Sequence, residues 1–107
     1  MDDHIITVRG SLATWRVDVN DLLSVEVDVS VCRFRFDLGE DFYVGRTLKE
    51  VHALLPDDLF VQISRKVVIN KRKIKKYAKD KVYVSLELGY PVPVRNRKMV
   101  KDLIRKQ

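Results

Sequence analysis

The chain has 107 residues, 46% of them hydrophobic, with a formal net charge of +6 and a single cysteine. This length fits one domain over residues 1–107, and the composition excludes disordered, collagen-like and disulfide-stabilised proteins. No apolar run approaches the roughly 18 residues that cross a bilayer. The acidic start Met1-Asp2-Asp3-His4 differs from a secretory signal, so we expect a cytoplasmic protein that does not bind membranes.

The charge is unevenly distributed along the chain. Residues 1–60 contain six basic and twelve acidic side chains, a net charge of −6. Residues 61–107 contain fifteen basic and three acidic side chains, a net charge of +12, and the basic ones recur in separate segments. This distribution favours a basic face for a polyanion such as nucleic acid over a merely solubilising surface.

Alternation of apolar and polar residues predicts β-strands through most of the first part. The alternating segments are residues 6–9, 14–19, 23–29, 31–36 and 42–44. Half-buried strands of antiparallel sheets have this pattern. Because Cys32 alternates with Phe34 and Phe36, we interpret it as a small core residue rather than a reactive thiol.

A helix is predicted after these strands. Thr47 and Glu50 form the capping-box pattern, in which Thr is the N-cap and Glu lies three residues on. Apolar residues follow at helical spacing as far as Leu55, and Pro56 ends the segment after about two to three turns. We expect His52 at the surface of this helix.

Strands are again predicted at residues 60–63, 67–69 and 82–88, with a basic segment between the last two. Residues 90–94 must form an edge or short strand, because their two prolines cannot donate to a ladder. A final helix with a basic face opens at residues 95–97. The predicted class is mainly β with one internal and one C-terminal helix, which disfavours a helix-turn-helix reader.

No catalytic or metal site is evident in the sequence. A metal site needs several ligands at close spacing, and His4 and His52 are the only histidines. The G-x-S-x-G, Walker and G-x-G-x-x-G motifs are absent, and the acidic pairs lie in expected turns. We therefore expect no enzymatic activity, no metal and no cofactor.

The second part of the chain carries side chains suited to reading DNA. Arginine and asparagine make bidentate contacts with base edges, and lysine suits phosphates. Candidates near expected strand ends and helix starts are Arg65, Asn70, Arg95, Asn96 and Arg97. Basic residues surround them, among them Lys66, Lys71, Arg72, Lys73, Lys75 and Lys76.

Several of these residues have a structural alternative. Asn70 could cap a turn through its own side chain, and Asn96 could be the N-cap of the last helix. Arg65 could pair with an acidic residue of the first part across a sheet. The basic C-terminal helix could lie on an anionic membrane, although its small apolar stripe is needed for packing.

Six stretches in register resemble the LytTR-type DNA-binding domain of bacterial transcriptional regulators, over nearly the whole chain. Residues 63–70 are similar to the family's I-H-R-S-Y-L-V-N, and residues 92–97 to its I-P-V-S-R-R. The other stretches are residues 21–26, 47–51, 55–60 and 73–74. Ser64, Lys66 and Val67 replace the family's usual His, Ser and aromatic residue, so the family's target sequence does not transfer.

The resemblance implies an elongated, mainly β fold of about ten strands in three small antiparallel sheets, with one short internal helix and a C-terminal helix. It implies recognition of double-stranded DNA by loops that enter successive major grooves, commonly on paired direct repeats that are bent. The base contacts that it implies come from Arg33 in the region 30–33, Arg65, Arg95, Asn96 and Arg97. We expect phosphate contacts from Lys66, Asn70, Lys71, Arg72, Lys73 and Lys98.

We therefore predict a sequence-specific transcriptional regulator that binds duplex DNA, with a homodimer on paired repeats. Most family members carry a receiver domain or membrane segments before this domain, whereas few residues precede the first expected strand here. A full-length chain of this kind would take its input from a separate regulatory protein. The alternatives are a protein-interaction module that kept the fold, and a single-strand binder, which the inward-facing aromatic residues disfavour.

Overall fold

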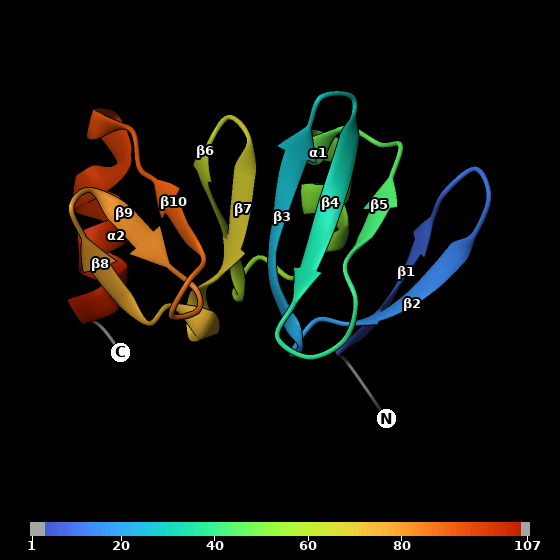
Figure 1. Ribbon diagram of the computed structural model, residues 1–107, viewed down its shortest axis with the longest axis horizontal. Coiled ribbons are helices and arrows are strands. Elements are labelled where there is room, and N and C mark those ends of the chain that lie inside the picture. The colour runs from blue at the N-terminus through green and yellow to red at the C-terminus, as the bar shows by residue number, and fades with distance from the viewer. Residues whose placement is uncertain (1–3, 106–107) are drawn as a thin grey trace.

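The structure is a computed structural model that describes residues 4–105. Residues 1–3, part of the acidic start on which the expectation of a cytoplasmic protein rests, lie outside the described part. Within these residues, ten strands form three antiparallel sheets, which confirms the predicted fold class (Figure 1). The first sheet is a hairpin of β1 (Ile5–Arg9) and β2 (Thr14–Asp18). The central sheet has the order β5-β4-β3-β7-β6, and the third has the order β10-β9-β8.

The remaining elements follow these bounds. The central strands are β3 (Leu22–Asp28), β4 (Val31–Phe36), β5 (Phe42–Val44), β6 (Phe60–Ser64) and β7 (Val67–Asn70). The third sheet consists of β8 (Lys76–Ala78), β9 (Lys81–Tyr83) and β10 (Gly89–Pro91). The helices are α1 (Leu48–Leu54), α2 (Arg97–Arg105) and two 3₁₀ turns, η1 (Lys71–Lys73) and η2 (Val94–Asn96).

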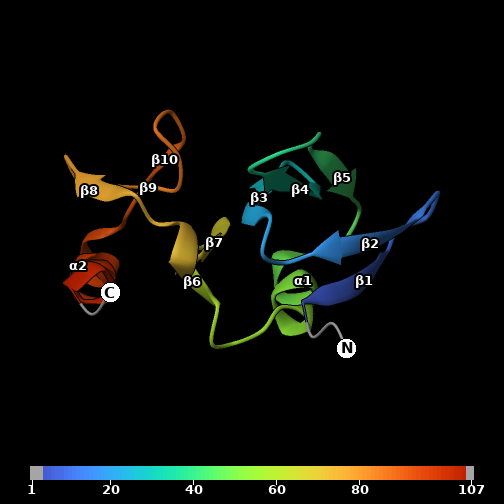
Figure 2. The ribbon, with the colours of Figure 1, turned by 90° about the horizontal axis from the view of Figure 1, so that it is seen from below.

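The central sheet is covered on both faces, because successive strand residues point to opposite sides. Val25, Phe34 and Val68 belong to one core, with α1 and the β1–β2 hairpin. Ile63 and Ile69 belong to a second core with β9, β10 and α2. Figure 2 shows this arrangement, with α1 and the hairpin on one side of β3–β5 and α2 beside β8 at the far end. The molecule measures 38 × 34 × 23 Å, with the sheets side by side along its longest axis.

The interpretation of Cys32 as a small core residue is confirmed. Its side chain is buried beside Phe34 in the first core, and its thiol donates to the carbonyl of Arg46 at 3.1 Å. Burial raises the pKa of the Cys32 thiol, with a further contribution from the negative charge of Glu50. The thiol is therefore protonated at neutral pH and is a poor nucleophile.

The predicted capping box is present at the start of α1. Thr47 Oγ1 accepts a hydrogen bond from the Glu50 amide at 3.1 Å, and Glu50 Oε1 accepts one from the Thr47 amide at 3.0 Å. The Thr47 amide and the Thr47 hydroxyl, which also donates to Glu50 Oε1 at 3.0 Å, lower the pKa of the Glu50 carboxyl because they favour its charged form. The helix ends at Leu54, two residues before Pro56, as predicted.

We expect Thr47→Ala to lower the free energy of unfolding by about 0.5–2 kcal/mol, the usual cost of losing an N-cap. Since the folded pKa of Glu50 is lowered, its contribution is present above the carboxyl's unfolded pKa and is lost as the pH falls through the folded pKa. Urea unfolding at neutral and acidic pH measures both effects. Ser11→Ala, in an exposed turn, is the control. Equal stability of Thr47→Ala and the wild type at neutral pH would contradict the capping role.

Two elements of the third sheet differ from the prediction. The expected strand over residues 82–88 stops at Tyr83, because the Val84 amide donates to the Leu88 carbonyl at 3.0 Å and closes a loop. Leu86 alternates with Val82 and Val84 in the sequence but is 84% exposed at this loop. The expected edge strand is confirmed as β10, at the edge of its sheet. The basic segment contains a strand that was not predicted, β8.

Gly89 explains how β10 pairs with β9. It lies directly opposite Tyr83, and a Cβ atom at this position would come within 2.5 Å of the Tyr83 ring. The absence of a side chain therefore lets the ring cover the backbone of β10. The same ring lies 4.7 Å from the ammonium group of Lys76 on the other neighbouring strand.

Candidate nucleic-acid interface

Three connecting segments lie along one edge of the molecule, the upper edge in Figure 1. They are the β3–β4 turn (residues 29–30), the β6–β7 turn (residues 65–66) and the segment from η2 into α2 (residues 94–98). We call this set the loop edge. The Val27 amide donates to the Lys66 carbonyl at 2.8 Å, which ties the end of β3 to the β6–β7 turn.

Arg65 lies at the centre of the loop edge. It lines three clefts: one is shared with the β3–β4 turn, one with α1, and one of about 620 Å³ with Pro93 and Arg95. Its side chain is exposed, and within residues 4–105 it forms no hydrogen bond or ion pair. Within the described residues, Arg65 therefore does not form the cross-sheet salt bridge that was its structural alternative. The Arg65 guanidinium keeps its donors available to a ligand.

Three further basic residues lie near Arg65 on the loop edge. Lys66 follows Arg65 in the turn, and Arg95 and Lys98 lie on the third segment of the loop edge. All three side chains are exposed, and none is paired among the residues that the structure describes. Together with Arg65 they place four unpaired positive charges along one edge.

Asn96 and Arg97 are placed differently from Arg95. The Asn96 side chain donates to the Ile63 carbonyl at 2.9 Å, so it holds the start of α2 against β6 and does not cap the helix. The Arg97 guanidinium donates to the Val92 carbonyl at 3.0 Å and lies 3.6 Å from the Asp80 carboxylate. Both side chains fix the segment that presents Arg95.

Arg33 lies on β4, beyond the β3–β4 turn. Its guanidinium contacts the Asp41 carboxylate at 2.8 Å and lies 5.6 Å from the centre of the Tyr43 ring. The hydrogen bond to Asp41 raises the pKa of Arg33 further above its usual range. Its charge is therefore balanced on the face of the sheet, unlike that of Arg65.

The candidate residues of η1 are at the opposite end of β7 from the β6–β7 turn. Asn70 is 1% exposed; its amide donates to the carbonyls of Val19 at 3.2 Å and Leu22 at 3.0 Å and accepts from the Arg72 amide at 2.9 Å. The alternative role, a cap for the following turn, is the one that the structure has. A buried amide with these partners cannot reach a phosphate, so the phosphate contact predicted for Asn70 does not fit the structure.

The cations of η1 are also separated from the loop edge. Lys73 Nζ lies 3.4 Å from the Asp37 carboxylate in the β4–β5 loop. Arg72 is exposed, and Lys71 is half-buried. The four residues of β7 separate this group from Arg65, a distance of about 13 Å at the usual rise per strand residue. The η1 cations and Arg65 are close in the sequence, but the fold places them at opposite ends of β7.

We expect Asn70→Ala to lower the free energy of unfolding by about 1–3 kcal/mol, because it removes the hydrogen bonds to the Val19 and Leu22 carbonyls and the acceptor of the Arg72 amide. Urea unfolding measures this loss. Arg72→Ala, which removes an exposed side chain of the same turn, is the control and should change stability little. A DNA-binding defect in folded Asn70→Ala with unchanged stability would contradict the structural role.

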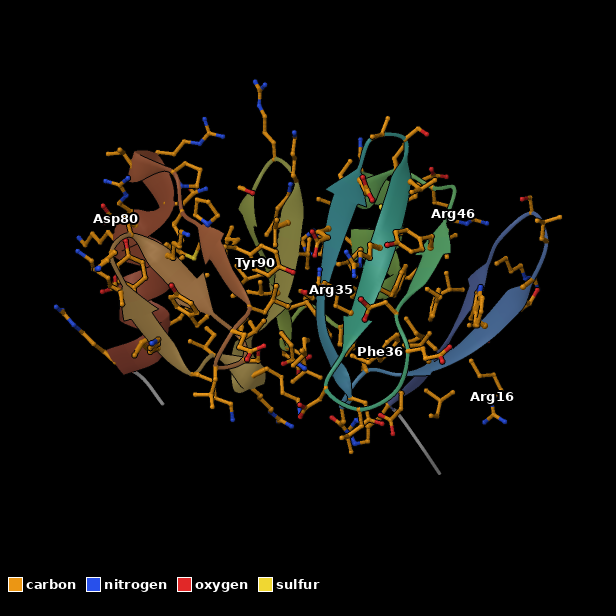
Figure 3. All side chains as sticks on the ribbon, viewed as in Figure 1. Arg16, Arg35, Phe36, Arg46, Asp80 and Tyr90 are labelled. Atoms are coloured by element: carbon orange, nitrogen blue, oxygen red, sulfur yellow. The ribbon has the colours of Figure 1, made fainter. Side chains whose placement is uncertain are left out.

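A partly buried chain of hydrogen bonds links the third sheet to the central sheet. Tyr90 on β10 shares a hydrogen bond of 2.7 Å with the Ser24 hydroxyl and donates to Glu26 Oε1 at 2.8 Å. Arg35 donates to the same Glu26 oxygen at 3.1 Å, and Figure 3 shows Tyr90 and Arg35 pointing toward each other from their two sheets. Burial, with the nearby Glu26, raises the pKa of the Tyr90 hydroxyl, which therefore stays protonated and can donate. This chain fixes how the third segment of the loop edge sits relative to the first two.

Sequence reasoning did not identify the role of Tyr90. A signal for it exists in β3, where Ser24 is a polar residue among four consecutive buried positions. A serine at a fully buried strand position needs a hydrogen-bond partner from another element. The identity of that partner is set by the packing of β10, 66 residues later.

Over residues 4–105, no group of three or more histidine, cysteine or acidic side chains is placed to hold a metal ion. The helices of the same residues are too short to cross a membrane. Val100 of α2 is buried in the second core, and Met99 packs against the same core.

The comparisons with known proteins agree with this architecture. The family model of the LytTr DNA-binding domain matches residues 13–105. Among solved structures, the LytTr DNA-binding domain of a protein described as a methyl-accepting/DNA response regulator from Bacillus cereus is similar, with a TM-score of 0.72 and 18% identity. The match covers 95% of this chain and 97% of that one. No curated protein matches. With a match that spans all three sheets except β1, the chain belongs to the LytTR family of DNA-binding domains.

Proposed function

We propose that this DNA-binding domain is a sequence-specific regulator of transcription that reads the major groove of duplex DNA through the loop edge. The observation that carries the proposal is the set of four exposed, unpaired cations, Arg65, Lys66, Arg95 and Lys98, on three adjacent connecting segments. Family membership supports DNA binding in general. The finer assignment of groove and residues rests on the loop edge.

The shape of the β6–β7 hairpin supports a reading role. The major groove is about 12 Å wide and admits a two-stranded β-ribbon. The β6–β7 hairpin forms one side of the central sheet, where β7 also pairs with β3, so the part that can enter the groove is its tip, Arg65 and Lys66. Arginine can make two parallel hydrogen bonds to the O6 and N7 atoms of guanine, whereas lysine suits a phosphate.

The residues divide into four proposed roles. Arg65 and Arg95 contact bases, and Lys66 and Lys98 contact phosphates. Asn96 and Arg97 position Arg95 through the carbonyls that they bind. Arg33 stays with Asp41 and orders the face of the sheet. The cations of η1, Lys71, Arg72 and Lys73, reach phosphates only where the duplex bends around the end of the domain.

We further propose that two copies bind paired direct repeats as a homodimer on DNA, with a separate regulatory protein as the input. One domain offers a short loop edge, and two sites in tandem multiply affinity through the shared duplex.

Selection from random duplexes at physiological salt tests the function. We expect an enriched sequence, bound far more tightly than random duplex, with an affinity that falls steeply as salt rises. A single strand of the same sequence should compete poorly. Equal enrichment of all duplexes would refute specific reading, and the absence of salt-dependent duplex affinity would favour the protein-interaction module instead.

A further inference from the structure

The β3–β4 turn has an unusual residue at its tip. Asp28 pairs with Val31, so residues 29 and 30 form a two-residue hairpin loop. Val29 has φ of 60°, and Ser30 is not among the residues with positive φ. A two-residue turn with positive φ at its first position only is the type that selects glycine there. A β-branched residue in this conformation is a genuine outlier.

The side chain of Val29 gains no burial in compensation. It is 95% exposed, among the most exposed large apolar side chains of the described residues. A glycine would relieve the backbone strain, and a polar residue would suit the exposure. Strain at a residue that contributes nothing to the core points to a role outside the chain.

The position of Val29 indicates what that role is. Val29 and Ser30 line the same cleft as Arg65, which places the exposed valine on the loop edge with the proposed base-reading residue. In the major groove, the only apolar group that a base presents is the C5 methyl group of thymine. Ser30, next to it in the turn, can bond to a phosphate or to a base edge.

We propose that Val29 is a specificity-determining residue that packs against the C5 methyl group of a thymine, next to the base that Arg65 contacts. This assignment rests on the proposed function and adds an apolar contact to it. The neighbouring segment has a second exposed valine, Val94, at 74% exposure, but its backbone carries no positive φ and we assign it no contact.

The test replaces thymine by deoxyuridine, which lacks only the methyl group, one position at a time in the selected duplex. At one position close to the base specified by Arg65, we expect the affinity of the wild type to fall about fourfold, the fold-change that corresponds to one buried methyl group. Val29→Ala should lose a similar factor on the thymine duplex. In Val29→Ala the same deoxyuridine should cost nothing further, because the two changes remove one contact.

Leu38→Ala is the matched control, since Leu38 is an exposed apolar residue in the β4–β5 loop at the opposite end of β4. It should leave every affinity unchanged. The assignment is overturned if no thymine position responds to deoxyuridine, or if the deoxyuridine effect persists in full in Val29→Ala. Failure to enrich any sequence would refute the proposed function itself. A selected site that depends on Arg65 but shows no coupling to Val29 would refute this assignment alone.

Discussion

Arg65→Ala is expected to weaken binding to the selected duplex by about 1–3 kcal/mol and to relax the base preference at one position. The physical reason is that the Arg65 donors are unpaired within the described chain and lie between the other two segments of the loop edge. Losing a bidentate contact to guanine removes discrimination as well as affinity. Titration of fluorescent duplexes, with each base varied at that position, measures both.

Two further variants separate charge from base reading. Arg65→Lys keeps the charge but loses the planar pair of donors, so it should retain the salt dependence and lose the base preference. Arg16→Ala removes the same charge from β2, where the side chain is exposed at the far end of the molecule from α2 (Figure 3), and should change little. An Arg16→Ala effect as large as that of Arg65→Ala would mean that net charge alone governs binding.

Phe34→Ala is expected to lower the free energy of unfolding by about 3–5 kcal/mol, a large part of the stability of a small domain. Phe34 is fully buried, and its ring stacks on Phe42 at 4.7 Å between centroids. Phe42 in turn stacks on Trp15 at 4.1 Å, so the three rings join β4, β5 and β2. Removing the Phe34 ring leaves a cavity next to the Phe42 ring.

Urea unfolding followed by the fluorescence of Trp15, the only tryptophan of the chain, measures this loss. Leu12→Ala is the control, because Leu12 is 98% exposed in the β1–β2 turn and buries nothing. A cost below about 1 kcal/mol for Phe34→Ala would contradict the packing, since large-to-small core substitutions rarely cost so little.

The predictions of local structure succeeded where neighbours in the sequence decide the conformation. The capping box needs only Thr47 and Glu50, three residues apart, and it is present as predicted. Alternation from Val31 to Phe36 identified which side chains face the core, because the pleat fixes their direction. Alternation over residues 82–88 wrongly predicted a strand through Leu86, which lies exposed in a loop after Tyr83.

The predicted site residues have suitable chemistry, but the structure places them in different surroundings. Arg65 and Arg95 are exposed and unpaired within residues 4–105, as base-contacting residues need to be. Asn70, of equally suitable chemistry, is buried, and its partners Val19 and Leu22 lie 51 and 48 residues away. Nothing in the residues adjacent to Asn70 reveals these partners.

By itself, the sequence determined the mainly β class, the position of α1 and the concentration of positive charge in residues 61–107, because these depend on composition and on short periods. The resemblance of six short stretches was enough to identify the family. Only the tertiary structure decided which cations share an edge. The four residues of β7 carry the chain from Arg65 on one edge to η1 at the opposite end, so residues close in sequence point to different surroundings. Conversely, the Asn96 amide binds Ile63, 33 residues earlier, and brings Arg95 beside the β6–β7 turn.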